Sequence, residues 1–210
     1  MRLEKILPSA GNSGRLTLLF DDGSSLKCGP DEVLRFVLSR GTEMDEENIA
    51  RLKSACEYYS VRMKAAELTA MKAMSAGELK KKLREKGASE EDAERASERL
   101  RELGAIDEAE YARMIVRRYA AKGYGKARIA AELRRHMLPE EYREDALSEL
   151  PESGEKIDSF IRERLSGKKP DMREKKRVSD ALARRGYGWE DISSAMRRYE
   201  ETAEDSEEDS

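Results

Sequence analysis

The sequence predicts a mainly α-helical fold of tandem three-helix, helix-turn-helix-like repeats, preceded by a small β-hairpin and helix. One apolar pattern recurs: shifts of 50 and 99 residues carry Leu79, Leu83 and Leu100 onto Ile129, Leu133 and Leu150, then onto Val178, Leu182 and Tyr199. Charged residues make up 40% of the 210 residues and aromatic residues only 6%, a composition typical of solvated helices. Repeats of this length stack into arrays that offer long surfaces to large partners.

The N-terminal residues 1–45 predict a β-hairpin and a short helix. Apolar residues alternate from Leu16 to Phe20, Asp22-Gly23 is a tight-turn dipeptide, and the returning strand ends at Cys28. The segment from Leu3 to Leu7 could add a third strand, and a helix is expected over 31–39. Because a lone hairpin is marginally stable, we expect it to pack against a helix.

A long linking helix is predicted over residues 46–73, with Asp45 as its N-cap. Its apolar positions follow a heptad spacing, at Ile49, Leu52, Cys56, Tyr59, Met63, Ala66 and Ala70. This seam either packs on the body of the same chain or forms a dimeric coiled coil. The small side chains near its end would weaken a coiled coil.

The repeats follow, with boundaries at residues 74–122, 123–167 and 168–201, the last of them truncated. Ser75 with Glu78 and Asp107 with Glu110 are capping boxes that open helices. Glycines mark helix ends. The expected helices cover 76–86, 90–103 and 108–121 in the first repeat, 126–137, 140–149 and 155–165 in the second, and 172–185 and 189–201 in the third.

Charge is distributed unevenly along the chain. The eleven residues from Glu200 hold seven acids and no base, whereas residues 71–199 hold 31 bases and 26 acids. The mildly basic repeats suggest contact with nucleic acid or with an acidic protein face. Residues 202–210 are predicted to be a disordered acidic tail that either keeps the basic body soluble or competes with DNA for it.

The sequence lacks the usual signatures of an enzyme or of a cofactor site. His136 is the single histidine, so neither an imidazole metal cluster nor a Ser-His-Asp triad is indicated. Gly123-Tyr124-Gly125-Lys126 lacks the remaining residues of a phosphate-binding loop. Cys28 and Cys56 have no metal spacing, which suggests reduced thiols in the cytoplasm. No segment resembles a signal peptide or a membrane span, so no membrane partner is expected.

Basic clusters are the candidate binding residues. Six bases fall within ten residues from Lys168 to Arg177, and others surround the turn at Gly123-Tyr124-Gly125. Long cationic side chains at this density suit phosphates or an acidic groove, although many such residues are simply solvated helix surface. Tyr119, Tyr124, Tyr187 and Trp189 could stack on bases. The candidates are Arg117, Arg118, Lys122, Lys126, Arg128, Arg134, Arg135, Lys168, Lys169, Lys175, Lys176 and Arg177.

An ordered set of motifs resembles the RecX family, the regulators of the bacterial RecA recombinase. The resemblance is strongest over residues 74–133. It rests on Ser75-Ala76-Gly77-Glu78-Leu79, Leu83, Gly87, Leu100, Gly104, Ile106-Asp107, Tyr111-Ala112, Gly123-Tyr124-Gly125, Ile129 and Glu132-Leu133. The chain departs from the family at Lys72, where arginine is frequent, at Met137-Leu138, where a glycine-containing turn is usual, and in its acidic tail.

The resemblance implies tandem three-helix repeats in an elongated, curved array that binds the groove of the RecA–single-stranded DNA filament. It implies that the chain is not an enzyme and that it inhibits the ATPase, strand exchange and co-protease activities of RecA, acting in DNA repair and the SOS response. Multipoint contact through the basic clusters would then turn weak sites into useful affinity. Filament capping and groove binding both remain open.

Two other functions stay open at the sequence level. Three-helix units can act as helix-turn-helix modules that bind single- or double-stranded DNA directly. Alternatively, the heptads could make the chain a dimeric helical adaptor. We expect a monomer, and sedimentation of the free protein would test this directly.

Overall fold

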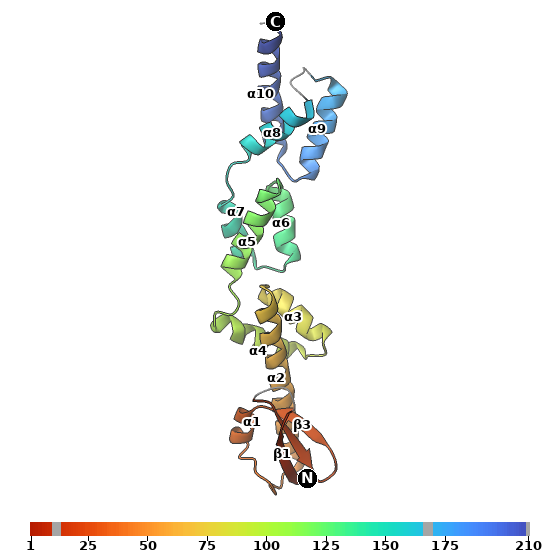
Figure 1. Ribbon diagram of the computed structural model, residues 1–210, viewed down its shortest axis with the longest axis vertical. Coiled ribbons are helices and arrows are strands. Elements are labelled where there is room, and N and C mark those ends of the chain that lie inside the picture. The colour runs from red at the N-terminus through yellow and green to blue at the C-terminus, as the bar shows by residue number, and fades with distance from the viewer. Residues whose placement is uncertain (10–13, 166–169, 209–210) are drawn as a thin grey trace. The chain divides into compact units, whose positions relative to one another are not determined.

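The computed structural model describes residues 1–9, 14–165 and 170–208 (Figure 1). The chain divides into two compact units. The first contains Met1–Ala73 and Leu79–Ile106, and the second contains Met74–Glu78 and Asp107–Ser210. In the part of the chain that is described, helices dominate and the strands are confined to the first 28 residues.

The first unit begins with a three-stranded antiparallel sheet of order β1-β2-β3. The strands are β1 (Leu3–Pro8), β2 (Leu16–Phe20) and β3 (Ser25–Cys28), so the hairpin and the third strand expected from the sequence are both confirmed. Leu18 lies opposite Ile6 on one side and opposite Leu26 on the other.

Helix α2 (Glu46–Met71) packs on this sheet through the first half of its heptad seam. Ile49, Leu52 and Cys56 join a core that also contains Leu3 and Phe20. Asp45 caps the helix, because its Oδ1 accepts a 2.8 Å hydrogen bond from the Asn48 amide. Farther along, Met63 is half-buried, whereas Ala66 and Ala70 are exposed. The predicted seam is therefore intramolecular over its first half.

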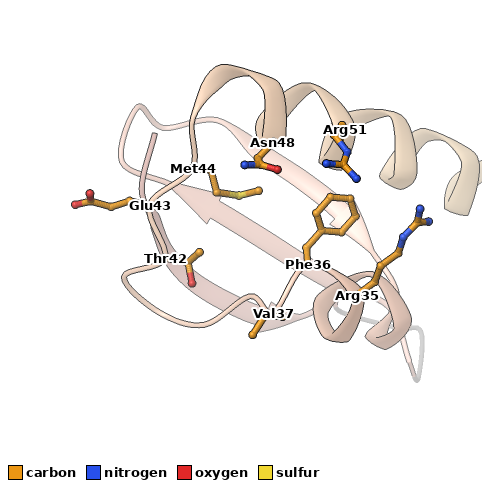
Figure 2. A pocket seen from close by; sticks show the side chains of 8 residues that line it. All are labelled: Arg35, Phe36, Val37, Thr42, Glu43, Met44, Asn48 and Arg51. Carbon is orange, nitrogen blue, oxygen red and sulfur yellow. The ribbon is translucent and has the colours of Figure 1, made fainter.

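Helix α1 (Pro30–Arg35) ends before the predicted 31–39 because the backbone leaves helical geometry at Val37, which has a φ of 50°. A β-branched residue with positive φ is a steric outlier. The chain turns there, and Phe36 points from the end of α1 toward α2 (Figure 2). Helices α3 (Ala76–Glu85) and α4 (Glu90–Glu102) match their predicted bounds within one residue, and α4 contacts α2.

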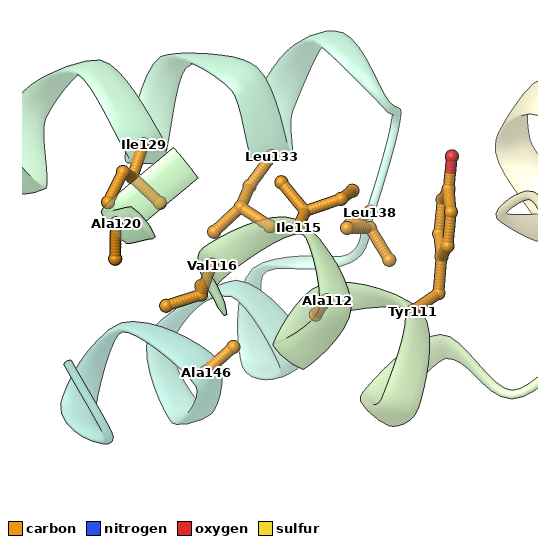
Figure 3. Packing of buried hydrophobic residues seen from close by; sticks show 9 residues of the cluster. All are labelled: Tyr111, Ala112, Ile115, Val116, Ala120, Ile129, Leu133, Leu138 and Ala146. Atoms are coloured by element: carbon orange, nitrogen blue, oxygen red, sulfur yellow. The ribbon is translucent and has the colours of Figure 1, made fainter. Parts of the chain in front are cut away.

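The second unit has two hydrophobic cores, each made by three consecutive helices. The first core joins α5 (Glu108–Ala121), α6 (Lys126–Arg135) and α7 (Glu140–Ser148). Figure 3 shows Ile115 and Val116 of α5 meeting Leu133 of α6 and Ala146 of α7. Both ends of α5 lie where the capping pattern placed them.

The second core joins α8 (Gly154–Leu165), α9 (Met172–Arg184) and α10 (Trp189–Glu208). Ile157 and Ile161 of α8 pack with Leu182 of α9 and Ile192 of α10, each 0–1% exposed. The two cores confirm that the repeats are built from three-helix units.

The cores group the helices differently from the boundaries 74–122, 123–167 and 168–201. Helix α5 packs with the helices that follow it, and α8 packs with α9 and α10, so each group starts one helix before the sequence boundary. The third group is complete when α8 is counted with it. The repeat spacing reproduces the helices but does not determine which three share a core.

The acidic C-terminal stretch also differs from expectation. Residues 202–208, predicted to be disordered, form the last turns of α10, and 209–210 lie outside the described residues. Ala203 is 5% exposed and continues the buried stripe of Ala195 and Met196 on the same helix. Burial of this stripe stabilises the extra turns. None of the described helices is long and apolar enough to cross a membrane.

Candidate interaction surface

Two turns that lie about sixty residues apart in the sequence meet in the second unit. The amide of Gly125, at the start of α6, donates a 2.9 Å hydrogen bond to the Arg185 carbonyl after α9. The Ala127 amide donates to the Gly186 carbonyl at 3.1 Å. We call this contact of residues 123–127 with residues 185–187 the Gly125 junction. It connects the three-helix core of α5–α7 to that of α8–α10.

The Gly125 junction depends on the absence of side chains at two positions. A Cβ added to Gly125 would lie 2.4 Å from the carbonyl carbon of Gly186. A Cβ added to Gly186 would lie 2.4 Å from the amide nitrogen of Arg128, and Gly186 has a φ of +88°. Both contacts are with backbone atoms, so they cannot be relieved by a rotamer change. The glycines therefore hold the start of α6 against the end of α9.

The repeat relates bases near the starts of α6 and α9, and the Gly125 junction meets α9 at its opposite end. Lys126 and Arg128 lie on the first turn of α6, and Lys175 and Arg177 lie 49 residues later on the first turns of α9. Lys126, Arg128 and Arg177 are exposed, as is Lys176. The second and third helical groups thus offer cations at equivalent places.

Aromatic side chains near the α5–α6 turn are already engaged with cations. The rings of Tyr119 and Tyr124 lie 5.6 Å apart and pack against the core of α5–α7. Lys122 Nζ lies 5.5 Å from the centre of the Tyr119 ring, and Arg128 lies 5.9 Å from that of Tyr124. These rings support the cations. Trp189, at the start of α10, is instead 70% exposed.

Several of the candidate bases form ion pairs with nearby acids. Arg117 lies 2.6 Å from Glu110, and this pair holds the pKa of Glu110 below its usual value. Arg128 and Arg135 lie 3.3 and 3.4 Å from the carboxylate of Glu132, a residue that is 4% exposed. Such pairs reduce the charge that these arginines present to a partner.

Lys175 differs from its neighbours on α9. Its Nζ lies 2.5 Å from a carboxylate oxygen of Glu200 on α10, and its side chain is 29% exposed. The α9–α10 packing thus uses an acid of the C-terminal stretch to neutralise one of the candidate bases. Lys176 and Arg177 remain exposed, whereas Lys168 and Lys169 lie outside the described residues.

The remaining candidates divide by position. Arg118 lies on α5 and is exposed. Lys122 caps the end of α5, next to Lys126 across the turn. Arg134 lies at the other end of α6 and is exposed. The structure therefore gathers Lys122, Lys126 and Arg128 beside the Gly125 junction, and it separates them along α6 from Arg134 and Arg135.

A second junction within the same unit was missed by sequence reasoning. The Ser75 hydroxyl donates to the His136 carbonyl at 2.5 Å, and the buried Glu108 accepts a 2.9 Å hydrogen bond from the Ala76 amide. A Cβ on Gly77 would lie 2.7 Å from that of Met137. We call this contact of residues 75–78 with Glu108, Tyr111 and residues 136–137 the Ser75 junction.

Polar side chains converge at the Ser75 junction. The Tyr111 hydroxyl donates to Glu78 Oε2 at 2.9 Å, and His136 Nδ1 lies 3.1 Å from both Glu78 Oε1 and the Tyr111 hydroxyl. Burial, followed by the Glu78 carboxylate, raises the pKa of Tyr111. The sequence showed only the capping box of Ser75 and Glu78, which is confirmed by a 3.0 Å bond from the Glu78 amide to the Ser75 hydroxyl. Nothing in the local sequence indicated the tertiary contacts that this capping box makes.

Nothing in the described part of the chain gathers three or more His, Cys, Asp or Glu side chains into a metal-binding arrangement. The prominent features of the second unit are exposed cations and packed junctions. This arrangement can bind an anionic partner at several points.

Comparison with known proteins places these features in a family. The family model described as "RecX, second three-helix domain" matches residues 107–147, which coincide with α5–α7. "Regulatory protein RecX" of Mycobacterium sp. (strain JLS) is 33% identical over 57% of this chain and 70% of its own length. The protein of the same name from Pseudomonas fluorescens (strain SBW25) is 36% identical over 64% of this chain and 88% of its own length.

Two solved structures share the fold. A crystal structure of regulatory protein RecX matches 94% of this chain and 98% of its own chain, with a TM-score of 0.76 and 22% identity. The crystal structure of RecX from Lactobacillus salivarius matches 68% and 96%, with a TM-score of 0.61 and 18% identity. The matched three-helix domain and the relatives' identity over most of their length lead to one conclusion: the chain belongs to the RecX family of regulatory proteins.

Proposed function

We propose that this protein binds the RecA–single-stranded DNA filament and inhibits the ATPase, recombinase and co-protease activities of RecA in DNA repair and the SOS response. It acts without catalysis of its own, as a cytoplasmic monomer. Membership of the RecX family supports this proposal, together with the exposed cations of the second unit.

The observation that carries the proposal is the repetition of bases at the starts of α6 and α9, of which Lys126, Arg128 and Arg177 are exposed and Lys175 is paired with Glu200. Lys126 and Arg128 on one helix correspond to Lys175 and Arg177 on the other, and the Gly125 junction ties the two helical groups together. A filament repeats its surface along its axis, so a repeated cationic surface can engage phosphates or acidic side chains on it at several points. Multipoint contact raises affinity without any strong single site.

The test measures binding to bare single-stranded DNA, to free RecA and to the ATP-bound RecA–DNA filament at about physiological salt, with RecA ATPase followed in the same samples. A strong preference for the filament with falling ATPase supports the proposal. Equal binding to bare DNA without an effect on ATPase would point instead to a direct DNA-binding protein, for which the exposed Trp189 offers a stacking surface.

The basic surface is tested by the double variant Lys176→Glu, Arg177→Glu. Lys175 is left in place because its partner is Glu200. If both bases contact phosphates, filament affinity falls and the slope of log K against log salt flattens by at least about 1.4, since each lost contact with a single strand changes it by about 0.7. The matched control is Arg99→Glu, Arg101→Glu on α4, which makes the same charge change on exposed residues of the first unit.

The dimeric adaptor receives less support. Ile49, Leu52 and Cys56, in the first half of its seam, are buried in the chain's own core, and the exposed seam residues Ala66 and Ala70 are small. The dimeric adaptor would regain support if the free protein sedimented as a dimer and the Ala66→Glu variant sedimented as a monomer.

A further inference from the structure

A pocket of about 300 Å³ lies in the first unit, outside the basic surface of α6 and α9 (Figure 2). The end of α1, the following turn and the first turns of α2 surround it. Its lining residues are Arg35, Phe36, Val37, Thr42, Glu43, Met44, Asn48 and Arg51. This volume lies at the small end of ligand pockets, and it suits one or two side chains.

An apolar side chain lies at the edge of the pocket and takes no part in the hydrophobic core of the sheet. Val37, which lines the pocket, is 81% exposed. Val37 is held with a φ of 50°, although a β-branched side chain opposes that conformation. This conformation closes the C-terminal turn of α1, where the Leu38 amide donates to the Val33 carbonyl at 2.9 Å, and it leaves the Val37 side chain in solvent. Phe36 and Met44 form the inner wall and are half-buried against the sheet core.

Two arginines from different helices flank the same pocket. Figure 2 shows the guanidinium groups of Arg35 and Arg51 on the side of the Phe36 ring, and both side chains are exposed. The ion pairs found among residues 1–9, 14–165 and 170–208 include neither of them. A guanidinium fork binds a carboxylate through two parallel hydrogen bonds. The pair is therefore placed to hold an acidic group above an apolar wall.

We infer that this pocket docks an acidic protein segment that carries an exposed apolar side chain. The apolar side chain enters beside Phe36 and Met44, and the carboxylate meets Arg35 and Arg51. Arginine, methionine and aromatic residues are those enriched at protein interfaces. The inference rests on the proposed function, in which the protein that supplies this segment is RecA, and it adds a protein contact in the first unit to the cationic contacts of the second.

Nucleic acid fits this pocket less well. The guanidinium carbon of Arg35 already lies 5.7 Å from the centre of the Phe36 ring, so an arginine covers the face on which a base would stack. The aliphatic side chain of Val37 offers little to a base. Residues 1–70 hold ten bases and eleven acids, a balance that does not attract a polyanion.

The test compares the full chain with the double variant Arg35→Glu, Arg51→Glu. Its binding to the ATP-bound RecA filament and to a bare oligothymidylate is measured, and the salt slope is recorded. We expect filament affinity to fall about tenfold or more, as for the loss of an interface hot spot. Oligothymidylate binding should stay unchanged, whereas the salt dependence of filament binding should weaken because two ion pairs are lost. Arg99→Glu, Arg101→Glu again controls for net charge.

A second variant, Val37→Asn, probes the apolar side chain at the edge of the pocket without endangering the fold, because asparagine tolerates a positive φ. We expect it to weaken filament binding several-fold, again without affecting oligothymidylate. Equal loss of filament and oligothymidylate binding in either variant would make the pocket a nucleic-acid contact and overturn the inference. If the wild type binds the filament and neither variant binds it more weakly, the inference is overturned and the proposed function stands. A wild type that binds no filament would instead refute the proposed function, and the inference with it.

Discussion

The two junctions of the second unit occupy equivalent places in the repeat but are built from different chemistry. The Ser75 junction sets the first turn of α3 against the α6–α7 turn, and the Gly125 junction sets the first turn of α6 against the α9–α10 turn. The first uses a hydroxyl, two glutamates, a tyrosine and a histidine. The second uses backbone hydrogen bonds between glycine-containing turns.

A single position explains much of this difference. Shifts of 50 and 99 residues carry Gly87 onto Met137 and Gly186, and both of these turn residues have positive φ, at 53° and 88°. At Gly186 the neighbouring backbone comes close enough to exclude any Cβ. Met137 carries a side chain at the equivalent position, so the backbone of α3 cannot approach the α6–α7 turn as closely. Polar side chains complete that contact instead. The geometry of a repeat can thus be kept while its interactions are exchanged.

The largest effect should come from Gly186→Ala. The new Cβ would meet Arg128 backbone at 2.4 Å in a conformation that alanine opposes. We expect a loss of about 3 kcal/mol or more in the free energy of unfolding, since overpacking and backbone strain add. Urea unfolding followed by circular dichroism measures it. Gly154→Ala, where a Cβ meets nothing within 4 Å, is the control and should be neutral or slightly stabilising. A loss below 1 kcal/mol for Gly186→Ala would mean that the Gly125 junction opens easily.

Gly77→Ala should cost less, about 1–2 kcal/mol. Its Cβ would lie 2.7 Å from the Met137 Cβ, but alanine's better helix propensity offsets part of the clash. The double variant Gly77→Ala, Met137→Gly removes the opposing Cβ and relieves the positive φ, but it retains the contact with the carbonyl oxygen of residue 137 at 2.8 Å. We therefore expect the double variant to be more stable than the sum of the two single changes predicts. If the stability changes of the two single variants simply add in urea unfolding, residues 77 and 137 do not interact energetically.

Each junction has a buried tyrosine whose hydroxyl can be removed. Tyr111 donates to the Glu78 carboxylate, whereas Tyr187 donates to the Gly123 carbonyl at 3.0 Å. Hydrogen bonds to charged groups are the stronger kind. We expect Tyr111→Phe to cost about 1.5 kcal/mol and Tyr187→Phe about 1 kcal/mol in thermal or urea unfolding. The reverse order would indicate that the backbone junction relies more on its side chain.

The smallest predicted effect is a dependence on alkaline pH. Burial and the Glu78 carboxylate raise the pKa of Tyr111 above its ordinary value of 10.0, and burial also raises that of Tyr187. The folded state therefore holds these protons more tightly than the unfolded state. Their contribution to stability is complete below pH 10 and is lost as the pH rises through the higher folded-state values. Unfolding free energies measured from pH 8 to pH 11 should fall, and they should fall less in Tyr111→Phe.

Local signals predicted most of the helix bounds. Asp45 and Asp107 each accept a 2.8 Å hydrogen bond from the amide three residues later, and their helices begin where the caps indicated. Such signals act within one turn, so they can be read from sequence. They did not reveal that α1 stops at Arg35, where the Leu38 amide donates to the Val33 carbonyl and closes the turn, or that α10 continues to Glu208, where packing buries Ala203.

The sequence proposed the candidate bases, and the tertiary structure decides how each of them is exposed and paired. The exposed bases Lys126, Lys176 and Arg177 lie where the sequence suggested cations. Lys175 pairs with Glu200, a partner 25 residues away that is brought near only by the packing of α9 on α10. The pocket between Arg35 and Arg51 likewise had no signal, because its walls come from two helices and the turn between them.

By itself, the sequence determined the period of the helices, their caps, the small sheet and the family, because each depends on interactions within a few residues or on an ordered set of motifs. The tertiary structure alone decided which three helices share a core. A periodic chain looks the same from any starting helix, so its phase is set by contacts such as those of Ile115 with Leu133 and Ala146. It also decided how the groups are joined, because the approach of Gly125 to Gly186 is a property of two backbones brought together and not of either segment alone.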